Sequence, residues 1–595
     1  MMNREKDEEK GAQTSSINNN RRKKGGWTAV KYILANETFE KLASMSLVTN
    51  ITVYLRTKYN MDGILLVNVV NLWSGSCNFL TFPGALLSDA YLGRFCTLLL
   101  GTLVSMLGMG AMTLGAGVQK LRPLACKAGS NCMAATSWQL AVLFIALLLL
   151  AMGAGCIRPC NIAFGADQFD PRTEKGRALL ARFYNWWYFS FTISLLVALT
   201  TVVYIQTNIS WTIGFAIPTA CFALSSIIFL IGCPTYIYKK PQGSIFIDML
   251  KVTIAAYRKR NLTLLDQMSN QSFYDPPIII EDDDDDQLLN VPKLSRSNRL
   301  NFLDKACLIN QCAQEVDEGG MAKNNWTLCS VQQVEQLKSL IGILPVWLTG
   351  ILCFVSMDQQ NTFGILQAIQ MNRKLGSRFL IPPAWIGFAG MAALSLWILS
   401  YERLILPVAR KVMKKGDVRL SVKARIKIGI IMSILCMSVA AIVESKRRNT
   451  AIRNNSFVSS IHVGCLAPQL ILSGLTEAFA AVTIMEFFTT QMPESMRSIA
   501  GSIFFISLSM ASYLATLIVN IIYRATRRND GYAWLGGHDL NKNHLDYFYA
   551  IIACIGVLNF FYFSFFASKF VFVDNSAKTN NEGACSSTNI HTRLE

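Results

Sequence analysis

The sequence predicts an all-α membrane protein that crosses the bilayer many times, and three observations support this fold class. Hydrophobic residues make up 52% and charged residues 16% of the 595 residues, whereas soluble domains carry roughly 25% charge. The apolar residues gather in runs, such as residues 141–155, instead of alternating with polar ones. A helix needs about 20 apolar residues to cross the hydrocarbon core, and such runs recur along the chain. Soluble multidomain, coiled-coil and collagen-like classes are thereby excluded.

Two sets of six candidate spans divide the chain. Residues 1–28 are expected to form a disordered cytosolic tail, because they are polar and end in the basic cluster 21–24. We then expect an N-terminal six-helix bundle over 29–238, a solvated cytosolic loop over 239–338 with the acidic run 281–286, a C-terminal six-helix bundle over 339–570 and a cytosolic tail over 571–595. The twelve spans are predicted near 30–55, 64–89, 95–117, 138–163, 183–206, 211–234, 339–366, 380–402, 424–444, 460–489, 498–522 and 547–570.

The charge and the cysteines narrow the set of partners. The chain has 56 Lys+Arg against 38 Asp+Glu, a net charge of +18. In a membrane protein such an excess faces anionic cytosolic lipid, so we expect lipid contact and no nucleic acid. Residues 446–448 are basic although they fall in a predicted outer loop. We expect no metal and no cofactor, since the cysteines form no CxxC pair. Cys126 and Cys132 lie in a predicted outer loop and can be disulfide-bonded or free.

The first span contains three charged residues, Glu37, Glu40 and Lys41. Their spacing of i, i+3 and i+4 places them on one face of a helix. An ionised group at mid-membrane costs at least about 3 kcal/mol on the insertion scale, so it needs a partner and usually has a function. Two carboxylates against one lysine leave one negative charge, which a proton or another cation must neutralise. One of the two carboxylates is therefore a candidate proton carrier, unless the cluster is hydrated and only fixes the helix register.

The fourth and tenth spans supply further charged residues. Arg158 precedes Pro159, which frees a backbone carbonyl and bends the helix. We expect Arg158 to pair with Glu37 or Glu40 while that carboxylate is ionised and to release it on protonation. In the tenth span, Glu477 is expected to line the central path. Glu486, nearer the cytosolic end, is expected to form a gate salt bridge with Arg497.

Several motifs resemble those of the plant nitrate/peptide transporter family, the plant branch of the proton-coupled oligopeptide transporters in the major facilitator superfamily. The matching motifs are Glu37–Lys41 (ETFEK), Gly84–Arg94, Phe164–Phe169 (FGADQF), Phe183–Trp186, Met496–Ser498 and Leu545–Phe548. The resemblance implies the major facilitator fold, in which two six-helix bundles alternate their access to the two sides of the membrane. It also implies that Glu37, Glu40 and Lys41 couple protons and that Arg158 is their salt-bridge partner.

The residues around the implied substrate path leave the solute open. The family more often has lysine where Arg158 stands, and the arginine resembles the subgroup with low-affinity nitrate and glucosinolate transporters. A histidine that engages nitrate in a relative matches Met357 here, so a histidine-based nitrate site is absent. Gln360 and Asn361 offer amides suited to sugar hydroxyls, although such amides equally often join neighbouring helices. We also expect Tyr54 to line the pocket.

Besides Glu486 and Arg497, four residues are expected to act in gating and one in regulation. By the resemblance, Asp89, Gly93, Arg94 and Asp167 hold the inward gate. Thr97 matches a regulatory phosphorylation site of a relative, which would make a kinase a partner. The alternative is a buried threonine whose hydroxyl bonds to its own helix.

The sequence therefore predicts a proton-coupled symporter of nitrate or of a related organic anion or glycoside, such as a glucosinolate. The expected partners are a small anionic or glycosylated solute, protons and lipid, and the expected location is the plasma membrane or else the vacuolar membrane. Two alternatives stay open: an uncoupled facilitator or exporter of the same fold, and a transporter-like sensor of nitrate or another solute. An enzyme is not expected, because no HExxH or GxSxG motif occurs.

Overall fold

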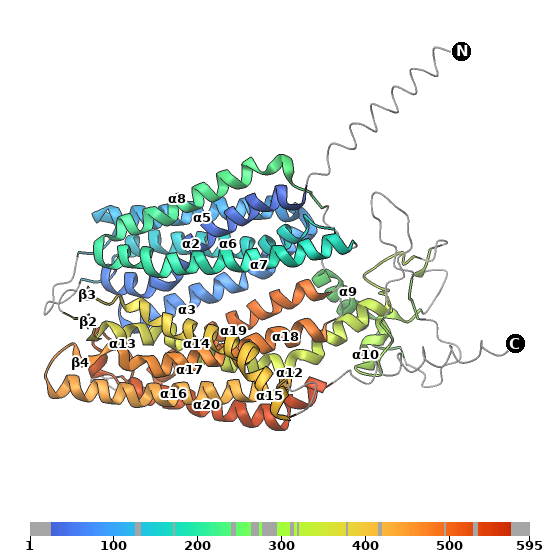
Figure 1. Cartoon of the computed structure of the whole chain (residues 1–595). Coiled ribbons are helices and arrows are strands. Elements are labelled where there is room, and N and C mark those ends of the chain that lie inside the picture. Colours follow the sequence, from blue (N-terminus) through green and yellow to red (C-terminus); the bar gives the residue numbers. More distant parts are fainter. Residues whose placement is uncertain are drawn as a thin grey trace, which may run out of the picture.

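In the computed structural model, the described residues form two bundles of long helices that lie side by side (Figure 1). The structure describes residues 25–124, 133–170, 173–239, 245–262, 273–276, 294–309, 315–317, 321–376, 379–413, 419–492, 496–527 and 533–572. Cys126 and Cys132, the acidic run 281–286 and residues 1–24 and 573–595 of the predicted tails lie outside these residues. The predicted first tail is too long, because α2 already begins at Gly26. The predicted all-α membrane fold is confirmed: ten helical stretches are long and apolar enough to span a bilayer.

The first bundle has six spans, and one apolar stretch contains two of them. The stretch 63–117 reverses direction at Gly93, whose φ of 75° favours glycine because it has no Cβ. The charged first span, α2, adds the sixth. The elements are α2 (Gly26–Lys58), α3 (Gly63–Phe79) with α4 (Thr81–Leu87) and η1 (Ser88–Leu92), α5 (Gly93–Gly117), α6 (Ser137–Ala166), α7 (Glu174–Val197) with η3 (Ala198–Val202) and η4 (Ile205–Ile209), and α8 (Trp211–Ile231).

The second bundle repeats this count with more interrupted helices. Its elements are α12 (Val331–Gln359) with η7 (Gln360–Gly364) and α13 (Ile365–Ile369), η8 (Pro383–Ile386) with α14 (Gly387–Ser400), η9 (Tyr401–Ile405) and α15 (Leu406–Met413), α16 (Val422–Arg453), η10 (Val463–Leu466) with α17 (Ala467–Thr476), η11 (Glu477–Ala481) and α18 (Val482–Gln491), α19 (Arg497–Thr526), and α20 (Leu545–Phe565) with η14 (Ala567–Phe572). Several interruptions are single π-helical turns, which often accompany functional sites.

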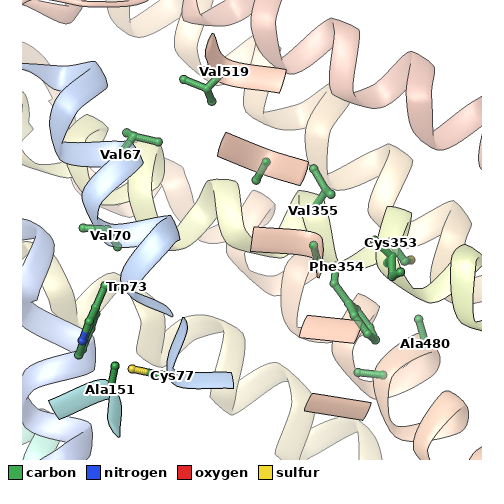
Figure 2. Packing of buried hydrophobic residues seen from close by; sticks show 14 of the residues in the cluster. Val67, Val70, Trp73, Cys77, Ala151, Cys353, Phe354, Val355, Ala480 and Val519 are labelled. Carbon is green, nitrogen blue, oxygen red and sulfur yellow. The ribbon is translucent and has the colours of Figure 1, made fainter. Parts of the chain in front are cut away.

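The helices pack through small residues and apolar side chains. A Cβ on Gly153 of α6 would lie 2.7 Å from the Gly101 carbonyl of α5, so glycine is what lets these two backbones approach. The larger hydrophobic core includes residues of both bundles. Figure 2 shows Trp73 and Cys77 of α3 beside Ala151 of α6, and Phe354 of α12 facing Ala480 of η11.

The segment between the bundles is partly folded, whereas the sequence predicted a solvated loop. Helices α9 (Ile245–Arg258) and α10 (Asn301–Asp304) lie at one end of the molecule, which we call the linker end (Figure 1). Met249, Val252 and Leu303 are buried in the main core, and Lys338 of α12 pairs with Asp304 at 2.6 Å. Apolar residues at helical spacing give α9 a buried face, which the sequence prediction of a solvated loop did not include.

The opposite end, which we call the far end, has short strands. Strand β1 (Met371–Asn372) pairs in parallel with β4 (Ser459–His462), and β2 (Lys374–Leu375) pairs antiparallel with β3 (Phe379–Leu380). Figure 1 shows these strands at the end away from α9 and α10. They connect helices of the second bundle only.

Candidate functional site

Glu37, Glu40 and Lys41 meet inside the first bundle. Both carboxylates are buried, with 0% and 4% of their surface exposed. The Lys41 ammonium nitrogen lies 2.9 Å from an Oε2 of Glu40 and 3.6 Å from an Oε1 of Glu37. The helical spacing of i, i+3 and i+4 brings these groups to one face, as the sequence predicts. The three groups together carry one negative charge when both acids are ionised.

Two neutral donors complete this cluster. The amide Nδ2 of Asn161 on α6 donates to Glu37 Oε2, and the hydroxyl of Ser44 donates to Glu40 Oε1 at 2.5 Å. Asn161 is 3% exposed. The sequence analysis did not assign a role to Asn161, although an asparagine inside a predicted span needs a polar partner for the same reason as a charge does.

Arg158 does not pair with a carboxylate in this conformation, so the predicted pair with Glu37 or Glu40 is wrong here. Its guanidinium donates through Nη1 to Asn78 Oδ1 of α3. It also lies over the ring of Phe505, 5.9 Å from the ring centre. The physical reason is that Lys41 already neutralises one of the two carboxylates and that Asn161 occupies the position beside Glu37. Because Phe505 belongs to α19, Arg158 reaches the boundary between the two bundles.

The polar residues at the end of α12 divide into two kinds. Gln360 is 3% exposed; its Oε1 accepts from Gln469 at 2.9 Å and its Nε2 donates to Cys436 Sγ at 3.7 Å. Its amide therefore joins helices, which is the alternative that the sequence left open. Asn361 is exposed, and its backbone oxygen accepts from the Thr52 hydroxyl of α2 at 3.3 Å. Met357 is half-buried against the core.

Asp358 is a carboxylate in this span that is not among the residues predicted from the sequence. Its Oδ2 accepts from the Ser512 hydroxyl of α19 at 2.6 Å. Among the described residues, no ion pair involves Asp358. Ser512 lies where the bundles touch, because a Cβ on Gly75 of α3 would come within 3.3 Å of it. The signal that finds Asp358 is the one used for Glu37: a carboxylate inside an apolar span.

Glu477 and Tyr54 have different surroundings. Glu477 begins the π-helical turn η11 and is half-buried. Within the described part of the chain it has no ion-pair partner, so it stays a candidate for the central path. Tyr54 is fully buried, and its ring contacts Trp211 at 5.0 Å and Phe215 at 4.8 Å between ring centres. Both partners belong to α8 of the same bundle. The role of Tyr54 in a substrate pocket stays a prediction.

The predicted gate residues of the first bundle do lie together at the linker end. Arg94 donates through Nη1 to Asp167 Oδ2, and its Nε lies 3.9 Å from an Oδ1 of Asp89. Lys239 adds a 2.9 Å contact to Asp167. The motif residues thus bind the turn between α3 and α5 to the end of α6. All four side chains belong to the first bundle or to its last residues, so these bonds do not cross between bundles.

Thr97 has the environment of a structural residue. It is 0% exposed, and its hydroxyl donates to the Gly93 carbonyl one turn earlier at 2.9 Å. A kinase cannot reach this hydroxyl in the described conformation, because it has no exposed surface. The regulatory role of Thr97 stays a prediction. The alternative that the sequence analysis retained, a hydroxyl bonded to its own helix, is the one observed.

Glu486 forms a gate-like pair, but with a different arginine from the one predicted. Arg425 of α16 binds it through two parallel bonds, from Nη1 to Oε2 at 2.7 Å and from Nη2 to Oε1 at 2.8 Å. Arg497 begins α19, and its side chain lies outside the described residues. Arg425 reaches Glu486 because α16 lies next to α18 in the second bundle, a neighbourhood that chain order does not reveal.

The basic residues 446–448 belong to α16 and not to a loop. Arg447 is fully buried and binds both oxygens of Glu444, with Nε to Oε2 and Nη2 to Oε1 each at 2.8 Å. Gln367 donates to Glu444 at 2.7 Å, and Arg447 donates to Asn541 at 2.8 Å. This buried pair removes the apparent conflict with the positive-inside rule at Arg447, because its charge is neutralised inside the protein.

The bundles contact each other at the far end and along α3 and α19. At the far end, Arg56 of α2 donates to the His538 carbonyl, and its Nη1 lies 2.9 Å from His538 Nδ1. Along the helices, Asn68 and Asn520 exchange hydrogen bonds of 3.0 and 3.1 Å. The last of these polar contacts toward the linker end joins Ser76 and Tyr513 at 3.2 Å. The described structure is therefore closed at the far end.

Comparisons with known proteins agree with this architecture. A family profile described as PTR2, the POT family, matches residues 95–535. The Arabidopsis thaliana protein NRT1/PTR family 2.8 is 53% identical over 549 residues, which cover 92% of this chain and 96% of the relative. NRT1/PTR family 2.13 of the same plant is 40% identical over 548 residues, covering 91% and 86%. The solved POT family transporter PepTSo resembles the fold with a TM-score of 0.65 at 15% identity, covering 92% of this chain and 99% of its own.

A profile match over most of the chain and relatives of this identity are sufficient to assign the family. The two six-helix bundles, the buried ETFEK cluster and the charged residues at the bundle boundary agree with that assignment. This chain belongs to the POT family of membrane transporters, in the branch of the plant NRT1/PTR proteins, and has the major facilitator fold.

Proposed function

We propose that this protein is a proton-coupled symporter of an anionic solute, with nitrate or a related organic anion or glycoside, such as a glucosinolate, as the solute. The observation that carries the proposal is the separation of charges in the first bundle. Glu37, Glu40 and Lys41 neutralise each other except for one negative charge, while Arg158 lies at the bundle boundary without a carboxylate. A proton can bind to the Glu37–Glu40 pair, and an anion can bind to Arg158.

The coupling follows from electrostatics. Protonating one carboxylate of the Glu37–Glu40 pair makes this part of the bundle more positive, which favours binding of an anion by Arg158. Arginine remains protonated at physiological pH, so the carboxylates carry the proton. Asp358, half-buried beside Ser512 on the other side of the boundary, is a further carboxylate within an apolar span.

The orientation that fits the charges places the linker end in the cytosol and the far end outside. The basic N-terminal segment and the middle segment then lie inside, as the positive-inside rule requires. In this orientation the described conformation is closed to the outside. Transport requires the far end to open, which breaks the contacts of Arg56, Asn68 and Ser76 with the second bundle. We assign the protein to the plasma membrane in this scheme.

The proposal is tested by solute uptake in oocytes at external pH 5.5 and pH 7.5, with ¹⁵N-nitrate and an allyl thioglucoside as probes. We expect at least one probe to accumulate more at the acid pH, together with an inward current. Arg158→Gln should raise the KM for that probe about tenfold or more, since charge-assisted hydrogen bonds contribute about 1.5–3 kcal/mol.

One control variant and two alternative outcomes separate this proposal from its rivals. Arg182→Gln removes another cation of the first bundle, one that lies over Trp27 at 5.3 Å and away from Arg158, and should leave KM unchanged. Equal uptake at the two pH values would indicate an uncoupled facilitator. Solute binding without uptake would indicate a sensor.

External acid should also loosen the closed far end. Burial and the Arg56 guanidinium lower the pKa of the His538 imidazole, and Asp62 opposes them only partly. The closed contact therefore uses neutral His538, whose Nδ1 accepts from Arg56, and its stability is lost as pH falls through this lowered pKa. Gln370 and Asp539 also lie at this contact. We expect a cysteine placed at Asn361 to be more accessible to an impermeant maleimide at about pH 5 than at about pH 7, when each labelling rate is divided by that of the unfolded protein at the same pH to correct for the thiolate fraction.

The matched variant for this expectation is His538→Gln, which keeps an acceptor but does not titrate in this range. Its normalised labelling rate should not depend on pH, after subtraction of the labelling of the chain without the added cysteine. A normalised rate that is equal at both pH values in the protein with His538 would contradict the role of His538.

A further inference from the structure

A polar cavity lies at the far end of the first bundle, away from the Glu37–Arg158 region. Its volume is about 240 Å³, which is several times the roughly 30 Å³ that one water molecule occupies in the liquid. Its walls come from the end of α2, the segment after α5, and the turn between η4 and α8. The lining residues are Lys58, Arg122, Gln206, Thr207, Ile209, Ser210, Trp211 and Thr212.

The charge of this cavity is positive and uncompensated by the described residues. Lys58 and Arg122 both line it, and no aspartate or glutamate is among the lining residues. Within the described part of the chain, neither cation forms an ion pair. The Lys58 ammonium and the Arg122 guanidinium repel each other at one cavity unless an anion lies between them. Most of the remaining lining side chains are polar. The hydroxyls of Thr207 and Thr212 donate to the carbonyls of Val203 and Ala116, which leaves the Ser210 hydroxyl to donate to an oxyanion.

The start of α8 adds a third source of positive potential to the same cavity. Ser210 precedes this 21-residue helix in an extended conformation, and its side chain makes no capping bond. The amides of the first turn therefore keep free N–H groups, and the helix dipole favours an anion there. Placing Lys58 and Arg122 beside a helix N-terminus is unfavourable without an anion, because all three are positive.

The ring of Tyr54 packs behind the cavity wall. Tyr54 is 0% exposed, and its ring lies 5.0 Å from that of Trp211, which lines the cavity. This aromatic packing holds the start of α8 against α2.

We propose that this cavity is an external anion site that binds one small oxyanion between Lys58, Arg122 and the first turn of α8. Nitrate, sulfate and phosphate share the required chemistry, and so does the phosphate of a lipid headgroup. The site is separate from the transport path, because Tyr54 and Trp211 pack within the first bundle. It holds an anion where the first bundle meets the external solution.

Calorimetric titration of the purified full-length protein tests this site, with sulfate, phosphate and nitrate added in lipid-free detergent at constant ionic strength set by chloride. We expect one sulfate or phosphate to bind per chain. Lys58→Gln and Arg122→Gln should each raise the Kd at least about tenfold, which corresponds to about 1.4 kcal/mol. Lys58→Arg keeps the positive charge and should bind the anion like the wild type. Retained binding by Lys58→Arg shows that a substitution at this position does not by itself unfold the protein.

Two matched controls make the result specific. Lys120→Gln removes an exposed cation two residues from Arg122 that does not line the cavity, and should leave the Kd unchanged. Glu40→Gln alters the proposed coupling site and should also leave it unchanged, so failure of the proposed transport mechanism and failure of this site are distinguishable. Binding that appears only in nanodiscs with phosphatidylglycerol would identify the headgroup as the source. Anion binding that is insensitive to both Lys58 and Arg122 would overturn the proposal.

Discussion

Glu40→Gln is expected to abolish pH-driven accumulation of the transported solute. The substitution leaves Glu37 alone with Lys41, so the cluster is neutral without a proton and no longer needs to bind one. A gradient of one pH unit is worth about 1.4 kcal/mol per proton, or about a tenfold accumulation, and this is the part of uptake that should disappear. The measurement is radiolabel or ¹⁵N uptake at two external pH values, normalised to the protein at the cell surface.

Ser44→Ala is the matched control for Glu40→Gln. It removes the hydroxyl that donates to Glu40 but keeps both carboxylates and Lys41. We expect coupled uptake to persist with an altered rate. If Glu40→Gln responded to external pH as the wild type does, coupling through this cluster would be wrong, whatever the solute.

Arg447→Leu is expected to lower the free energy of unfolding by about 3–5 kcal/mol, because breaking a buried ion pair leaves the other charge unpaired. Glu444 would keep only the bond from Gln367, and Asn541 would lose its donor. The loss should appear as a lower midpoint of thermal unfolding of the purified protein in detergent. Glu444 and Arg447 both have no exposed surface, so water cannot replace the missing partner.

Lys446→Gln is the control beside it, since Lys446 is exposed on the same helix. Its effect should stay within about 0.5 kcal/mol. The double variant Glu444→Gln/Arg447→Leu removes both charges and should be less destabilised than Arg447→Leu alone. An unchanged midpoint for Arg447→Leu would show that the pair is not needed for the stability of the second bundle.

The sequence by itself determined the membrane class, the order of the spans and the cluster on the first helix. Apolar runs are local, and a helix needs about 20 such residues whatever it packs against. Glu37, Glu40 and Lys41 are also local, because helical periodicity alone brings them to one face. The family motifs are also local in the sequence, so they indicate the family without knowledge of the helix packing.

Only the tertiary structure decided which partner each polar group has. Arg158 binds Asn78 instead of a carboxylate, Glu486 binds Arg425, and Asp358 meets Ser512. These residues lie on different spans, and their meeting depends on which helices are neighbours and how they are rotated. The cost of burying a charge is known from the sequence, whereas the group that offsets this cost is fixed by helix packing. For that reason the sequence located many of the charged sites, and the fold assigned their contacts.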